Sequence, residues 1–255
     1  MSLRNPTKIN SLLQNWPAGT VLLSSWLDEQ GIPSQLRQQY VKMGWLDGFG
    51  RGAFVRANDA PDIMGGLYAL QTQAGLPIHV GARTALGMQG FAHYLELNQH
   101  EVVLFGNRLA ILPLWFKKHD WGVSPVLHNS DFLPADLGLV DLQRKQFTVK
   151  GSGRARAIME CLYLAPNNFD LVEAYHHMEG IGSIRPDAVQ ELLMACGSVK
   201  VTRLFLYLAE KAGHNWLKYI DLAALDLGRG KRSLEPGGTF IPKYNMTVPT
   251  ELAQQ

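Results

Sequence analysis

One short segment carries the side-chain types that proteins use to read DNA. Leu36, Tyr40 and Met43 recur at i, i+4 and i+7 in a helix expected over Ser34–Met43, so they should face a core. The opposite face then presents amides, cations and a hydroxyl, which hydrogen-bond base edges and phosphates. A further arginine stands between two glycines, in a turn suited to a minor groove. The candidate DNA contacts are Ser34, Gln35, Arg37, Gln38, Lys42 and Arg51.

The elements that would position these side chains follow the order of a winged helix-turn-helix. An apolar helix over Thr20–Gln30, with Thr20 as its N-cap, ends at the break Gly31-Ile32-Pro33. Glycine suits a helix end, and proline suits the first turn of the next helix. After the second helix, aromatic and aliphatic residues between Trp45 and Val55 supply a hairpin with a glycine-rich turn. The second helix alone could equally be amphipathic with a solvated polar face, but the hairpin that follows it favours DNA binding.

Composition and charge agree with that interpretation. At 255 residues, with 46% hydrophobic and 18% charged residues, the chain is long enough for two modest globular domains. Residues 1–58 hold six Lys and Arg against three acidic residues, an excess of +3 within a net charge of +2. Phosphate contacts supply much of a DNA-binding protein's affinity, so the location of this excess is informative.

The sequence predicts a cytoplasmic protein without a membrane partner. No apolar run reaches the roughly 18 residues of a membrane span. The N-terminus shows no apolar run with a small-residue cleavage site, so we expect no signal peptide. Cys161 and Cys196 lie in apolar helical patterns, and we expect both to be reduced and buried.

The remainder of the chain predicts a small sheet followed by helices. A helix within residues 59–73 is expected to link two domains, which we place at residues 1–75 and 76–255. Local patterns predict a short helix over 82–89, strands over 101–105, 114–117, 123–128 and 146–149, and helices over 154–165, 169–179, 186–196 and 199–212. The expected fold class is α+β: an N-terminal winged helix-turn-helix, then a mixed α/β domain with a small sheet and C-terminal helices.

A second basic segment lies at residues 144–156. It holds five cations and no acid, and Gly151-Ser152-Gly153 opens a helix whose N–H groups would attract an anion. The last long helix adds a polar stripe that includes Lys200 and Arg203. The candidate anion- or partner-binding residues are Lys150, Ser152, Arg154, Arg156, Lys200 and Arg203. The alternative is that Ser152 caps the helix and the cations are solvated.

The sequence contains no recognised motif for catalysis or metal binding. The best metal candidates, His176 and His177 beside Glu179, include two adjacent helical residues that point about 100° apart and do not suit one ion. The chain has no HExxH, CxxC, GxSxG or GxxxxGKS/T pattern. We therefore expect no catalytic residues, no metal and no cofactor.

Four strings in the C-terminal third carry a family resemblance: "RARAIMECLYLAP", "MEGIGSIRPDAVQELLMACGSVKVTRLFLYLAEKAGHNW", "LDLGRGKR" and "YNMTVP". In this order they resemble the AbiEi family, the antitoxins of type IV toxin–antitoxin systems, over about residues 8–250. The resemblance implies an N-terminal winged helix that binds double-stranded DNA, at inverted repeats in the promoter of its own operon, and represses it. It implies that the remaining domain counteracts a nucleotidyltransferase-type toxin, without implying direct contact, and that the chain has no catalytic activity.

Three other functions remain alternatives to that expectation. The chain could be a stand-alone winged-helix regulator. It could be a nucleic-acid-processing enzyme that uses Arg154 and Arg156 on a phosphate, which would require carboxylates or a metal beside them. It could also be an interaction protein whose hairpin packs on a partner.

Overall fold

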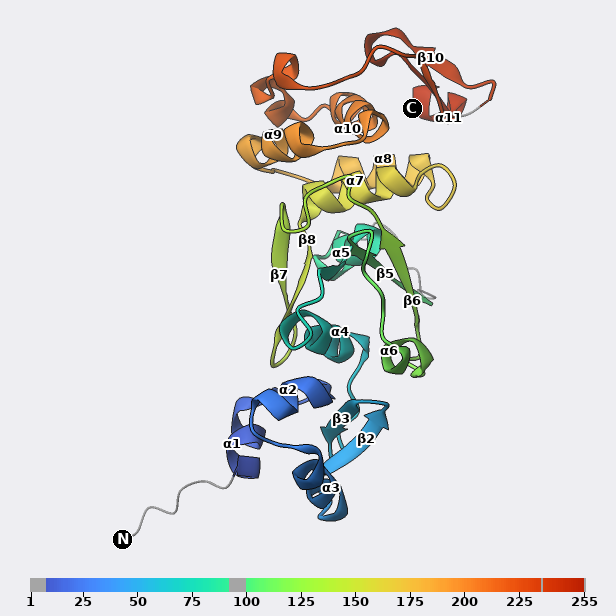
Figure 1. The fold of residues 1–255 in the computed structure, drawn as a ribbon. Helices are drawn as coiled ribbons and strands as arrows, with labels where there is room; N and C mark the ends of the chain where they lie inside the picture. Colours follow the sequence, from blue (N-terminus) through green and yellow to red (C-terminus); the bar gives the residue numbers. More distant parts are fainter. Residues whose placement is uncertain (1–7, 92–99, 235, 255) are drawn as a thin grey trace.

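The N-terminal region of the protein is a winged helix. The computed structural model describes residues 8–91, 100–234 and 236–254. Its first elements are α1 (Lys8–Asn15), β1 (Leu22–Leu23), α2 (Ser24–Glu29), α3 (Ser34–Lys42), β2 (Leu46–Gly50) and β3 (Ala53–Arg56) (Figure 1). The three strands form an antiparallel sheet in the order β1-β3-β2. Two helices joined by a short turn and followed by a hairpin confirm the predicted winged helix-turn-helix.

The single helix predicted over Thr20–Gln30 is wrong in its first turn. Leu22 and Leu23 pair with β3 as a short strand, and α2 begins only at Ser24. Thr20 is fully buried and is no N-cap, because its hydroxyl donates to the carbonyl of Pro17 at 2.8 Å and accepts from the Trp16 indole. A buried strand that runs into a short helix has the same apolar spacing as one longer helix, and the partner strand lies 30 residues further along the chain.

A five-stranded mixed sheet forms the middle of the molecule. Its order is β6-β5-β4-β8-β7, and its strands are β4 (Ile78–Val80), β5 (Glu101–Gly106), β6 (Ser124–Asn129), β7 (Leu139–Gln143) and β8 (Thr148–Ser152). The structure confirms the strands predicted near 101–105, 123–128 and 146–149, whereas β4 and β7 were not predicted. The helix α5 (Ala82–Met88) confirms the one expected over 82–89.

The strand predicted over 114–117 is instead a short helix, α6 (Leu114–Lys118). Pro113 precedes α6 as its N-cap residue, in an extended conformation. Trp115 and Phe116 are buried on one side of α6, while Leu114 and the two lysines at its end are exposed. The apolar run Leu114-Trp115-Phe116 is too short to separate a strand from one helical turn.

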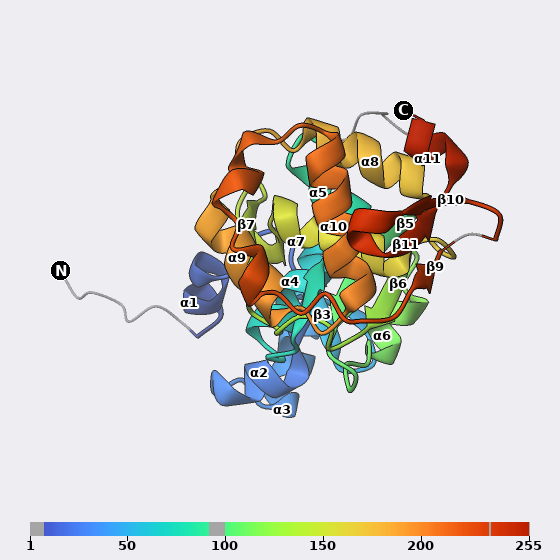
Figure 2. The ribbon, with the colours of Figure 1, turned by 90° about the horizontal axis from the view of Figure 1, so that it is seen from above.

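Helices cover the end of the sheet that lies farthest from the winged helix (Figure 1). They are α7 (Arg154–Leu164), α8 (Leu171–Gly180), α9 (Pro186–Ala195) and α10 (Val199–Lys211), and they confirm all four predicted segments. The C-terminal tail then lies over α10 (Figure 2); its elements are η1 (Asn215–Tyr219), η2 (Leu222–Ala224), β9 (Arg232–Ser233), β10 (Thr239–Ile241), η3 (Pro242–Tyr244), β11 (Met246–Val248) and α11 (Thr250–Gln254). In the part of the chain that the structure describes, no helix is both long and apolar enough to cross a membrane.

The helix α4 (Ile63–Thr72) packs the winged helix against the sheet region. Asp62 caps it by accepting from the backbone N–H groups of Met64 and Gly65, at 2.9 and 3.0 Å. A Cβ at Gly65 would lie 1.8 Å from the carbonyl oxygen of Gly19, so only glycine permits this close approach. The main hydrophobic core runs from β1 and β3 through α4 into the sheet. Because α4 shares a core with both regions, the division at 75 and 76 stays a prediction.

Candidate DNA-binding surface

The recognition helix α3 presents one polar stripe to solvent. Tyr40 and Leu36 point inward and pack in the small core of the winged helix, as predicted. On the outside, glutamines and a lysine recur at i, i+3, i+4 and i+7, which places them on one face. These exposed residues are Gln35, Gln38, Gln39 and Lys42, with Ser34 at the start of the helix. Gln39 was not among the predicted contacts, although its i+4 spacing from Gln35 could have identified it.

Arg37 does not belong to this exposed stripe. Its side chain is buried, with 8% exposure, and the Nη1 atom donates to the carbonyl oxygens of Ser24 and Ile32 at 3.2 and 2.8 Å. The same Nη1 atom forms an ion pair with Asp28 Oδ1 at 2.5 Å. Arg37 therefore ties α2 and the turn to α3, and its prediction as a base contact is corrected. The helical spacing had assigned Arg37 to the solvent-facing side of α3.

Replacing Arg37 with alanine should destabilise the winged helix rather than change which bases it prefers. Hydrogen bonds to a charged group contribute about 1.5–3 kcal/mol, so the free energy of unfolding should fall by about that amount. Urea denaturation measures the change, with Gln38→Ala as an exposed control expected within about 0.5 kcal/mol of wild type. Unchanged stability, together with a selective loss of preference for guanine, would restore Arg37 as a base contact.

The C-terminal end of α3 exposes apolar side chains. Met43 was expected to face the core, but it is 69% exposed and the prediction is wrong. The helix ends at Lys42, and Gly44, with φ +69°, redirects the chain directly after Met43. The inward face of α3 therefore does not extend to Met43. Val41 and Trp45 are exposed beside it, so the polar stripe of α3 borders a small apolar rim.

The wing is a tight hairpin whose turn requires glycine. Gly50 and Gly52 have φ of +150° and +78°, a backbone region that residues with a side chain rarely adopt. The register shifts between Gly48 and Gly50, which is typical of a bulge before a turn. Arg51 is exposed at the tip. Within residues 8–91, 100–234 and 236–254, neither Arg51 nor Lys42 forms an ion pair, so both cations can face a polyanion.

The wing is held in place by aromatic side chains of the sheet region. The ring of Phe49 lies 4.1 Å from that of His119 and 5.6 Å from that of Trp121, measured between centroids. A Cβ at Gly50 would lie 3.0 Å from the Cβ of Trp115. Burial lowers the pKa of His119, although the charge of Asp120 opposes the shift, so this ring is neutral at pH 7. The hairpin is therefore braced against residues 115–121.

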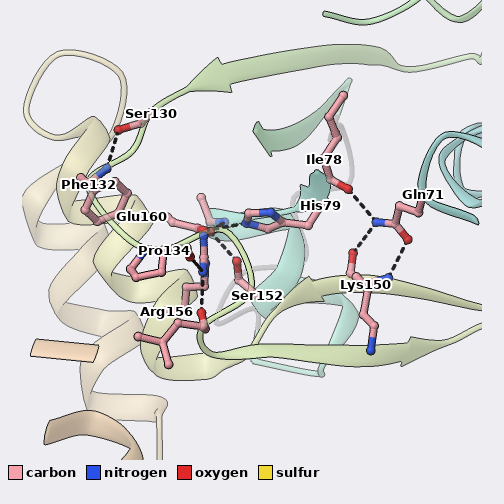
Figure 3. Close-up of polar contacts among 12 residues, drawn as sticks. Gln71, Ile78, His79, Ser130, Phe132, Pro134, Lys150, Ser152, Arg156 and Glu160 are labelled. Atoms are coloured by element: carbon pink, nitrogen blue, oxygen red, sulfur yellow. Dashed lines mark hydrogen bonds and ion pairs between the residues drawn. The ribbon is translucent and has the colours of Figure 1, made fainter. Parts of the chain in front are cut away.

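Two residues of the basic segment 144–156 are buried against a carboxylate and are not exposed to an external anion. Ser152 is fully buried and donates to Glu160 Oε2 at 2.7 Å, so it is neither a helix cap nor an anion ligand (Figure 3). Arg156 is 4% exposed; its Nε atom donates to Glu160 Oε1 at 2.9 Å and its Nη1 atom to the carbonyl of Pro134 at 2.7 Å. For these two residues the prediction is corrected, because Glu160, a buried carboxylate later in the chain, binds both of them.

The other predicted anion-binding residues also have partners within the protein. Arg154 stacks on the Phe91 ring at 4.8 Å and donates to a backbone carbonyl. Lys150, which is exposed, pairs with Asp141 at 2.9 Å. Lys200 donates to two carbonyls at the end of α7, and burial lowers its pKa. Arg203, 2% exposed, donates to four carbonyls of the C-terminal tail, those of Leu227, Gly228, Gly230 and Asn245.

The carboxylate of Glu160 is the centre of a buried polar cluster. Its Oε1 accepts from Nε2 of His79 and Nε of Arg156, both at 2.9 Å. Its Oε2 accepts from the backbone N–H of Ala82 at 2.9 Å and from Ser152. Burial would raise the pKa of Glu160, but the hydrogen bonds and charges of these neighbours together hold it below its usual value. All four lone-pair positions of the carboxylate are therefore occupied.

The Glu160 cluster has no room for a nucleic-acid strand. The adjoining cavity, lined by His79, Phe105 and Arg156 among others, measures about 20 Å³, which is the size of one water molecule. A carboxylate does lie beside Arg156, as the enzymatic alternative requires, but both side chains are buried, Glu160 fully so. Across the described ranges, no three His, Cys, Asp or Glu residues gather as a metal site. His176 pairs with Glu179 at 3.1 Å instead.

The order of elements and the exposed face of α3 define a winged-helix protein. Comparison with family models then identifies the family: residues 5–97 match the N-terminal domain of AbiEi antitoxin transcriptional regulators. Residues 99–249 match the model described as transcriptional regulator, AbiEi antitoxin, type IV toxin–antitoxin system. The chain belongs to this family of antitoxin regulators, as its C-terminal strings indicated.

Other comparisons add a shared fold. No curated protein sequence matches the chain. The crystal structure of the RV2827C protein from Mycobacterium tuberculosis is similar, with a TM-score of 0.60 and 14% sequence identity. The similarity covers 95% of this chain and 92% of that one. The arrangement of winged helix, sheet and C-terminal helices thus recurs in a protein with little sequence similarity.

Proposed function

We propose that the protein represses its own operon by binding inverted repeats in the promoter, and that it counteracts a nucleotidyltransferase-type toxin in the cytoplasm. The observation that carries the DNA-binding part is the exposed stripe of α3, where Gln35, Gln38 and Gln39 stand beside Lys42. Membership of the AbiEi antitoxin family supports both parts. Residues 76–255 would oppose the toxin.

The composition of the α3 stripe also suggests which bases it contacts. Glutamine forms paired hydrogen bonds with adenine in the major groove, whereas arginine favours guanine. With Arg37 buried, the outward stripe from Gln35 to Lys42 contains three amides and no arginine. We therefore expect the half-site to be read at A·T pairs. Lys42 and Arg51 would contact phosphates or the minor groove, and the nearby Val41 could meet a thymine methyl group.

A promoter fusion tests autorepression in cells. The chain's own upstream DNA drives a reporter, and wild type should repress it while a Gln35→Ala/Gln38→Ala double variant should not. Immunoblotting for equal amounts of protein provides the control, and Gln143→Ala, on the sheet, should repress like wild type. Equal reporter activity with and without the wild-type protein would contradict autorepression.

Growth rescue tests the antitoxin function separately. The full-length Gln35→Ala/Gln38→Ala variant, expressed from an unrelated promoter, should still restore growth when the product of the neighbouring toxin gene is induced. Rescue would show that toxin opposition does not depend on promoter binding. Repression without rescue by the wild-type protein would contradict the antitoxin part and favour a stand-alone regulator.

A further inference from the structure

The helix α6 lies directly beside the wing, although it belongs to the sheet region (Figure 1). Phe49 of the hairpin packs on His119 and Trp121, and Gly50 approaches the backbone of Trp115. The T-shaped contact between Phe49 and Trp115, at 6.2 Å between centroids, adds a third ring. These contacts fix the position of α6 relative to the tip of the wing. Whatever approaches Arg51 therefore also approaches α6.

The exposed face of α6 ends in two cations. Trp115 and Phe116 are buried, which leaves Leu114, Lys117 and Lys118 on the outward side at i, i+3 and i+4. Neither lysine forms an ion pair with any residue that the structure describes. The nearest acid in sequence, Asp120, accepts from the backbone N–H of Gly122 at 3.0 Å.

The two lysines differ in this respect from most basic residues of the sheet region. Arg108 pairs with Asp131 at 3.0 Å, Lys150 pairs with Asp141, and Arg156 is buried against Glu160. Arg144 pairs with Asp62 at 2.5 Å. Among the described residues of the sheet region, most basic side chains outside α6 are thus paired with an acid; Lys145, in the turn between β7 and β8, is an exposed exception. The two lysines of α6 keep their charge unopposed next to the wing.

We infer that Lys117 and Lys118 contact the DNA phosphate backbone beside the wing, so that the sheet region forms part of the DNA-binding surface. The inference rests on the proposed DNA binding and assigns two further contacts to it. A wing tip that enters a groove is flanked by phosphates on both sides, and exposed lysines held next to the tip complement that charge. The contacts are independent of base sequence. They lengthen the protected DNA beyond what the winged helix alone would cover.

Salt-dependent DNA binding tests the inference with the purified full-length protein. The Lys117→Ala/Lys118→Ala variant is compared with wild type on promoter DNA and on a scrambled duplex, by fluorescence anisotropy between about 50 and 200 mM salt. Each lost phosphate contact lowers the slope of log affinity against log salt by about 0.9, so the slope should fall by about 2. Affinity at low salt should fall about tenfold or more on both duplexes alike.

Matched variants separate this role from net charge and from folding. Lys218→Ala/Lys231→Ala also removes two exposed lysines, but in the C-terminal tail at the opposite end of the molecule (Figure 1), and should keep the wild-type slope. Lys117→Arg/Lys118→Arg keeps the charge and should keep the slope as well. A wild-type slope in the alanine variant, or a loss confined to promoter DNA, would overturn the inference while leaving the proposed function intact. Failure of the wild-type protein to bind either duplex would overturn both.

Discussion

Replacing Glu160 with alanine is expected to lower the midpoint of thermal unfolding by on the order of 10 °C. The change leaves the charge of Arg156 and the donors of His79, Ser152 and Ala82 without their shared acceptor in the interior. Breaking a buried ion pair typically costs about 3–5 kcal/mol, and each kcal/mol shifts the midpoint by about 2–4 °C in a chain of this size. Differential scanning calorimetry measures the shift.

An exposed glutamate provides the control for this effect. Glu179→Ala removes a surface pair with His176, for which about 0–1 kcal/mol is expected. If Glu160→Ala unfolded at the same temperature as Glu179→Ala, the cluster would contribute no more than a surface pair. That result would contradict a stabilising role for the buried Glu160 cluster.

The same cluster makes stability depend on pH. The pKa of Glu160 is lower in the folded protein than in the unfolded chain, where it is about 4.3. Its contribution is therefore fully present above about pH 4.3 and is lost as the pH falls through the folded-state pKa. Glu160→Gln, which cannot titrate, should be less stable than wild type at pH 7, and the difference should shrink as the pH falls below about 4.3 and through the folded-state pKa. A difference that grows on acidification would contradict this account.

Replacing Gln38 with alanine is expected to reduce discrimination between promoter and scrambled DNA by about tenfold. Gln38 lies in the middle of the exposed stripe, and a paired contact to one base contributes about 1–3 kcal/mol of discrimination. Affinity for scrambled DNA should change little, because no phosphate contact is lost. Arg51→Ala should instead weaken binding to both duplexes equally and lower the salt slope by about 0.9.

Paired DNA and protein changes make the Gln38 prediction sharper. Each A·T pair of the half-site is replaced with G·C in turn. At the base pair that Gln38 contacts, the replacement should weaken DNA binding by the wild-type protein but not by Gln38→Ala. Gln143→Ala, an exposed glutamine on β7, should behave like wild type throughout. Equal discrimination by Gln38→Ala and wild type would remove this residue from the set that reads bases.

Elements with a local signal could be predicted from the sequence. The helices α7 to α10 have apolar residues at helical spacing along their whole length, and α3 has both a start signal and an inward face. β4 was missed because its partner strands are 20 or more residues away in the sequence. β7 pairs with the adjacent strand β8, but its five residues, LVDLQ, do not alternate regularly between apolar and polar types. β1 was predicted as part of a helix because its partner strand, β3, lies 30 residues further along the chain.

The site was harder to predict than the fold because burial decides which cations are available. Arg37 and Lys42 lie five residues apart in the same helix, yet one is buried against Asp28 and the other is exposed. Arg156 belongs to a cluster with His79, 77 positions earlier in the numbering, which no local pattern reveals. The place of Lys117 and Lys118 next to the wing depends on the contact between Phe49 and His119, which are 70 positions apart and have no local signal in the sequence.

The central claim, that the outward face of α3 reads specific DNA, is tested most directly by comparing two affinities. Purified full-length protein is titrated into a duplex from its own promoter and into a scrambled duplex of equal length and composition, at about 150 mM salt. Specific binding exceeds non-specific binding by about 10³-fold or more in typical regulators, so the promoter duplex should bind with at least that preference. It should also lose most of the preference in Gln35→Ala/Gln38→Ala. Equal affinity of the wild-type protein for the two duplexes, or no binding to either at low salt, would contradict the account.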